Sequence, residues 1–154
     1  MEMPRPTEAH RRLEKLVGFW SGEEIMHPSP WDPAGGTAIG RNENRLALDG
    51  LAAIGDYEQE RNGIITFRGH AVYTYNAPEQ CYVCHWFDSM GMPPNVFRGT
   101  FEGDVLTMTC RDAQGHARLT YDFSEGGRIL SVMEMSQDGE TWSAMMEGSY
   151  VRQD

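Results

Sequence analysis

Residues 51–88 read LAAIGDYEQERNGIITFRGHAVYTYNAPEQCYVCHWFD, and this stretch gives the clearest indication of the fold class. Apolar and polar residues alternate through it, and two turn signals, Asn62-Gly63 and Asn76-Ala77-Pro78, interrupt the alternation. A period of two is typical of strands with one buried face, and Asn-Gly favours a hairpin because type I′ turns need positive φ at both central residues. The stretch therefore predicts three consecutive antiparallel strands.

The same rhythm continues on both sides of this stretch and predicts about ten strands between residues 18 and 152. The further turn signals are Asp49-Gly50, Gly91-Met92-Pro93-Pro94, Glu102-Gly103-Asp104, Gln114-Gly115, Gly126-Gly127 and Asp138-Gly139. Serial hairpins of this kind form either a sandwich or a closed up-and-down barrel. Short turns favour the meander, and closure removes exposed sheet edges. We therefore predict an all-β, antiparallel up-and-down barrel.

One short helix is expected before the strands, over about residues 8–17. Thr7 is a suitable N-cap, Leu13 and Leu16 recur at helical spacing, and Gly18 is placed to end the helix. A helix at this position could plug one end of the barrel. The whole chain, residues 1–154, is expected to form a single domain with the barrel over about 18–152.

Charge and composition restrict the expected partners and compartment. The chain has 23 acidic and 13 basic residues and a formal net charge of -10, which disfavours binding to nucleic acid or to anionic membranes. It has three cysteines and no apolar signal region near its start, which favours a cytoplasmic location. Composition leaves a homodimer open as a further expectation.

The first expected strand opens with Gly18-Phe19-Trp20-Ser21-Gly22, and the last ends with Tyr150-Val151-Arg152. The Gly-x-Trp pattern resembles the first strand of lipocalin-like (calycin) barrels. In that superfamily the tryptophan closes the barrel floor and a late arginine packs across it. The resemblance implies structural roles for Gly18, Trp20 and Arg152, and a guanidinium stacked on an indole is a favourable contact.

A wider set of segments resembles one bacterial family, domain of unknown function 1579, over about residues 8–152. The segments are LVGFWSGE, LDGLAAIGDYEQ, FRGHAVYTYN, CHWFDSMGMPP and SQDGETWSAMMEGSYVR. The resemblance implies a lipocalin-like barrel and no established reaction. Nitrobindins, which bind haem, are more distantly similar, but their axial histidine comes late in the chain and the last histidine here is His116. We therefore predict no cofactor and retain non-covalent haem binding as an alternative.

Cys81-Tyr82-Val83-Cys84-His85 has the spacing of a c-type haem attachment site. The segment is expected to be a strand, however, and alternate side chains of a strand point to opposite faces. The two thiols would then diverge, and no second Cys-x-x-Cys completes a zinc ligand set. We predict structural cysteines and no metal site.

Four polar residues are candidates for orienting a ligand inside the barrel. His70 and His85 lie on neighbouring expected strands, so their imidazoles could approach each other. If Trp20 points inward, strand parity also turns Glu24 inward, and a buried carboxylate needs a partner such as Arg68. These residues could bind a polar head group, or serve an enzyme of isomerase, cyclase or hydrolase type; the catalytic residues are unknown.

Aromatic and methionine side chains are expected to supply the apolar wall of a ligand cavity, although methionine is equally common as core filler. The residues selected for this role are Tyr73, Trp86, Met133 and Met146. No nucleophile elbow and no phosphate-binding glycine loop is present in the sequence. The sequence therefore favours non-enzymatic binding of a small apolar or amphipathic molecule, and a barrel that only mediates assembly is a further alternative.

Overall fold

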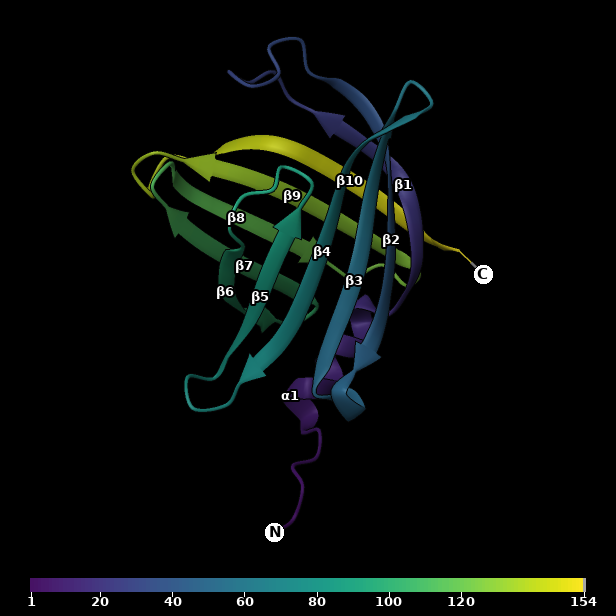
Figure 1. Ribbon diagram of the computed structural model, residues 1–154, viewed down its shortest axis with the longest axis vertical. Helices are drawn as coiled ribbons and strands as arrows, with labels where there is room; N and C mark the ends of the chain where they lie inside the picture. Colours follow the sequence, from purple (N-terminus) through teal and green to yellow (C-terminus); the bar gives the residue numbers. More distant parts are fainter. Residues whose placement is uncertain (154) are drawn as a thin grey trace.

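The computed structural model describes residues 1–153 and contains a closed antiparallel barrel of ten strands (Figure 1). Each strand pairs with the next along the chain, and β1 pairs with β10 to close the barrel. The strands are β1 Gly18–Met26, β2 Gly36–Ala47, β3 Ala52–Arg61, β4 Ile64–Asn76, β5 Cys81–Asp88, β6 Asn95–Glu102, β7 Val105–Asp112, β8 Gly115–Asp122, β9 Arg128–Ser136 and β10 Ser143–Gln153. The predicted up-and-down barrel is therefore confirmed.

The turns explain the meander. Asn62 and Gly63 have φ of 52° and 78° and join β3 to β4 as a tight hairpin, as Asn-Gly predicts. Irregular register occurs at Gln59/Glu60 and at Ala144/Met146, where the sheet needs extra curvature to close. Strands β1–β5 and β6–β10 cross at an angle in Figure 1, which gives the barrel two faces enclosing one interior.

The N-terminal helix is shorter than predicted and changes type. The α-helix α1 covers Glu8–Arg11, and a 3₁₀ turn, η1, covers Arg12–Leu16. A 3₁₀ turn aligns residues three apart, and this places Leu13 and Leu16 together in the barrel end, where they are 0% and 2% exposed. Tertiary packing of two leucines thus overrides the regular α-helix expected over residues 8–17.

The helical segment divides the interior into two parts. We call the part around Leu13 and Leu16, with its cluster of buried Phe101, Leu106 and Met108, the closed half. The other part, toward the ends of the strands farthest from the helix, is the open half. Figure 1 shows α1 beside the ends of β2 and β3, at the end of the barrel opposite the β1–β2 connection.

The barrel floor beside β1 has the predicted tryptophan–arginine contact. The Arg152 guanidinium carbon lies 4.4 Å from the centroid of the Trp20 ring, because the register places these two residues opposite each other on β1 and β10. Arg152 also donates to the Val17 carbonyl at 2.8 Å, and the Trp20 indole donates to the Leu16 carbonyl at 2.9 Å. Gly18 has φ of 139° and lies beneath Arg152, so a side chain there would collide with the guanidinium. These contacts attach the helical segment to the site of barrel closure.

Among residues 1–153, no helix is both long enough and apolar enough to cross a membrane.

Candidate ligand cavity

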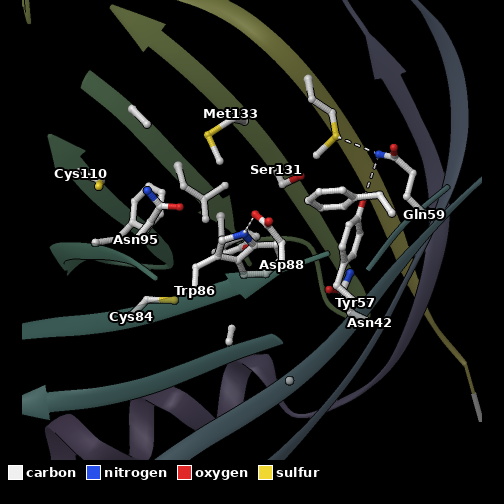
Figure 2. A pocket seen from close by; sticks show the side chains of 18 of the residues that line it. Asn42, Tyr57, Gln59, Cys84, Trp86, Asp88, Asn95, Cys110, Ser131 and Met133 are labelled. Carbon is white, nitrogen blue, oxygen red and sulfur yellow. Dashed lines mark hydrogen bonds between the residues drawn. The ribbon is translucent and has the colours of Figure 1, made fainter. Parts of the chain in front are cut away.

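A cavity of about 460 Å³ occupies the open half (Figure 2). Its lining comes from all ten strands and is mostly apolar or aromatic, with a few polar groups. The lining residues are Met26, Asn42, Asn44, Gly55, Tyr57, Gln59, Phe67, Ala71, Tyr73, Cys84, Trp86, Asp88, Asn95, Phe97, Cys110, Asp112, Ala117, Leu119, Tyr121, Ser131, Met133, Met135, Met146 and Tyr150. This size and composition are typical of small-molecule sites.

Trp86 forms part of the apolar wall. Its ring lies over Gly69 of β4, where any side chain would overlap the indole. Its centroid is 6.1 Å from that of Tyr57, and its Nε1–H donates to the Asp88 carboxylate at 2.8 Å. The indole is therefore held by contacts below and beside it and presents a fixed aromatic surface to the cavity.

The floor of the cavity is formed by Tyr73, Cys84 and Tyr121, which also belong to or pack against the closed-half cluster. The Tyr73 hydroxyl donates to the Tyr121 hydroxyl at 3.4 Å. Burial raises the pKa of Cys84 to about 12 and that of Tyr121 to about 12. At neutral pH the Cys84 thiol is therefore protonated, which makes it a small apolar wall element rather than a nucleophile.

The wall formed by β1, β3 and β10 contains a buried carboxylate, Glu24, which is 0% exposed. The Tyr57 hydroxyl donates to it at 2.7 and 2.8 Å, the Gln59 amide donates at 3.0 Å, and the Tyr150 hydroxyl donates as well. Gly40 leaves the space that this carboxylate needs. Desolvation and the neighbouring Glu24 raise the pKa of both tyrosines far above the ordinary value, so both remain protonated donors.

Three polar residues lie at the open end of the barrel: Asp88 on β5, Asn95 on β6 and Asp112 on β7. Asp88 accepts from the Met90 backbone N–H at 3.0 Å, and Asp112 accepts from that of Gln114 at 2.7 Å. The Asn95 amide donates to Asp112 at 3.5 Å. These contacts fix two carboxylates at the mouth of the cavity.

The predicted aromatic and methionine residues all line the cavity. Tyr73, Trp86, Met133 and Met146 come together there from four different strands. Glu24 also points inward as strand parity predicted, but it contacts the cavity only through Tyr57, Gln59 and Tyr150.

The predicted inward placement of three other polar residues is wrong. These residues are His70, His85 and Arg68, and none of the three lines the cavity. Their strand parity is opposite to that of the lining residues Ala71, Trp86 and Tyr57. Their side chains lie on the outer face of the barrel. His70 pairs with Asp56 at 2.8 Å and Arg68 with Glu58 at 2.9 Å.

The register places His70 opposite Phe87 and His85 opposite Val72, so the two histidines are diagonal neighbours on the outer face of β4 and β5.

The cysteines of Cys81-Tyr82-Val83-Cys84-His85 diverge as strand parity predicts. Cys84 is 2% exposed and lines the cavity, whereas Cys81 does not. Within residues 1–153 the three cysteines are free thiols, and no group of three or more histidine, cysteine or acidic side chains is arranged to hold a metal ion.

Sequence reasoning missed four polar lining residues: Gln59, Asp88, Asn95 and Asp112. Gln59 could have been found because it shares the parity of Tyr57 on one strand. Asn95 and Asp112 adjoin a loop and a turn, where composition alone does not tell which face a residue occupies.

Solved structures share this fold at low sequence identity. The crystal structure of Rv2717c from M. tuberculosis has a TM-score of 0.75 and 13% identity, covering 96% of this chain and 99% of that one. The S-type phycobiliprotein lyase CPES from Guillardia theta has a TM-score of 0.61 and 10% identity, covering 97% of this chain and 99% of that one. At these identities the likeness concerns the fold alone. It shows that both proteins share the barrel fold of this chain.

No curated protein sequence matches the chain significantly. The sequence profile described as "Protein of unknown function (DUF1579)" matches residues 5–152. The chain therefore belongs to the DUF1579 family.

Proposed function

We propose that this barrel binds a small molecule with an apolar or aromatic body, non-covalently, in the cavity of its open half. The cavity of about 460 Å³, with its apolar wall, is the observation that carries the proposal. A protein interior is normally close-packed, so a cavity of this size requires an explanation. Preformed apolar pockets with few polar groups are typical of ligand sites.

The lining favours binding over catalysis. None of the histidines among residues 1–153 lines the cavity. Burial raises the pKa of Cys84 to about 12 and also raises that of Cys110, so the wall offers neither an imidazole base nor a thiolate. The same absence of histidine from the lining gives no support to haem held by an axial histidine. The carboxylate of Glu24 is enclosed by its three donors and does not reach a bound molecule directly.

The proposal is tested by titration with the neutral dye N-phenyl-1-naphthylamine, whose fluorescence rises in an apolar site. Ala117→Trp places a large ring in the cavity, whereas Thr109→Trp adds the same ring on the exposed outer face of β7. We expect saturable binding by the native chain and by Thr109→Trp, and at least tenfold weaker binding by Ala117→Trp. Equal binding by all three proteins, or no saturable binding by the native chain, would contradict the proposal.

A further inference from the structure

Two sets of polar groups in the cavity, those around Glu24 and those at the mouth, present acceptors or negative charge, and this restricts the class of ligand. Asn42 and Ser131 also line the cavity and can donate. We infer that the barrel selects molecules that carry a hydrogen-bond donor on their apolar body, with a protonated amine preferred, and that it rejects carboxylates. This inference rests on the proposed function and assigns a ligand class to the same cavity.

The first step concerns the protons of Tyr57 and Tyr150. A phenol has one proton to donate and two lone pairs that accept. Both phenols donate to Glu24, so their oxygens have only lone pairs left for a ligand. The Gln59 amide nitrogen likewise donates to Glu24 and to the Tyr57 oxygen, each at 3.0 Å. On this wall the cavity therefore presents acceptors, and Glu24 is the positioning residue that orients them.

The second step concerns charge at the mouth. The Asp88 and Asp112 carboxylates line the cavity, and their hydrogen bonds come from neutral donors: Trp86 and the Met90 backbone for one, Asn95 and the Gln114 backbone for the other. Within residues 1–153 neither carboxylate forms an ion pair. An ammonium group entering here gains Coulomb attraction, and a carboxylate meets repulsion.

The third step is the absence of cations from the lining. In the part of the chain that the structure describes, no lysine, arginine or histidine lines the cavity. The arginines of neighbouring strands pair with carboxylates elsewhere, as Arg41 does with Glu60 and Arg118 with Glu134. A ligand carboxylate would lose hydration without gaining a counter-ion, which is unfavourable. An ammonium group would in addition have the aromatic faces of Tyr57 and Trp86 beside it.

Four probes with the same naphthalene body test this inference. They are 1-naphthylmethylamine, a cationic donor; 1-naphthylmethanol, a neutral donor; 1-(methoxymethyl)naphthalene, neutral without a donor; and 1-naphthylacetate, an anion. Calorimetric titration at low ionic strength should rank the affinities in that order, with the amine at least about tenfold tighter than the acetate. Equal affinity of the amine and the acetate, or of the alcohol and the ether, would overturn the inference while leaving the proposed function intact.

Two double variants test whether the mouth carboxylates cause the preference for the amine over the acetate. Asp88→Asn with Asp112→Asn should together reduce the preference for amine over acetate by at least about fivefold. The control, Glu79→Gln with Glu102→Gln, removes two exposed charges at the closed end, one in the β4–β5 turn and one at the end of β6, and should leave the preference unchanged. A preference that falls equally in both double variants would mean that net charge, and not the mouth, selects the ligand, which would overturn the inference.

A second pair of variants tests whether the ligand needs a hydrogen-bond donor. Tyr57→Phe removes a cavity acceptor and should narrow the difference between the alcohol and the ether, whereas Tyr75→Phe in the closed half should not. If Tyr57→Phe leaves that difference unchanged, the assignment of the acceptor wall is wrong. If none of the four probes binds the native chain, the proposed function and the inference fail together.

Discussion

The two halves of this barrel are built from the same strands but are filled differently. In the closed half, Leu13 and Leu16 enter between the strands and pack with Leu106 and Met108, each 0–2% exposed. In the open half no helix enters, and side chains of similar size surround about 460 Å³ of space. The strands set the diameter of the barrel, whereas a nine-residue segment, Glu8–Leu16, determines which half is solid.

Polar groups follow the same division. The closed half contains few, and the buried carboxylate Glu24 and the mouth residues Asp88 and Asp112 all belong to the open half. A buried carboxylate is costly unless it receives hydrogen bonds, and Glu24 receives them from three side chains. The open half is therefore less tightly packed than the closed half and contains more buried polar groups, as is usual for a binding site.

The largest expected effect comes from a pair of methionines, one in each half. Met108→Ala opens a cavity in the closed half, where Met108 is 0% exposed, and should lower the free energy of unfolding by about 2–5 kcal/mol. Met133→Ala only enlarges an existing cavity and should cost about 1 kcal/mol. Urea unfolding of both variants measures the difference. Equal losses would contradict the division into a solid half and a hollow half.

A smaller effect is expected at the boundary between the halves, where Cys84 is buried. Because its pKa is raised from 9.0 to about 12, the folded state keeps a proton that the unfolded state loses above pH 9. The stability that the protonated Cys84 thiol contributes to the folded state is complete below pH 9 and is lost as the pH rises toward 12. Between pH 8 and pH 10.5 the native chain should lose about 2 kcal/mol from this group alone.

Urea unfolding of Cys84→Ala at both pH values checks this contribution, since the variant should show a shallower loss than the native chain. Val83→Ala, on the same strand but with no thiol, is the control and should keep the native pH dependence. If Cys84→Ala and the native chain lose the same stability, the floor of the cavity is wetter than its burial indicates.

The smallest expected effect is at the contact between Trp20 and Arg152, where β1 pairs with β10. Arg152→Ala removes the stacking on Trp20 and the hydrogen bond to Val17, and it should lower the free energy of unfolding by about 1 kcal/mol. Arg111→Ala, an exposed arginine on β7, should change stability less. Dye affinity should be unaltered in both variants because neither residue lines the cavity. A loss of dye binding in Arg152→Ala would show that the two halves are coupled.

Much of the fold could be predicted from the sequence because its signals are local. Asn62-Gly63 specifies a hairpin through two positive φ angles, and alternation specifies which residues share a face. Trp20 gives the parity of β1, and the inward position of Glu24 follows from it. The 3₁₀ turn over Arg12–Leu16 could not be predicted, because it depends on how two leucines fit the barrel end.

The site was less predictable because it depends on parity and register across strands. Tyr73 and Trp86 line the cavity, and large aromatic residues favour interiors. The side chains of His70 and Arg68 have suitable chemistry, but a difference of one residue in parity puts them on the outer face. Asp112 could not be recognised as a mouth residue because the sequence does not tell which hairpin ends surround the cavity opening.

The division of the barrel into a solid closed half and a ligand-binding open half can be tested directly with the protein's ten methionines as reporters. Methyl NMR of the ¹³C-methionine-labelled native chain, titrated with 1-naphthylmethanol, separates the halves in one experiment. We predict that the signals of Met26, Met133, Met135 and Met146 shift with one binding curve, while those of Met108 in the closed half and of the exposed Met1 and Met3 stay in place. Shifts at Met108 or at the exposed methionines without shifts at the four lining residues would contradict the account.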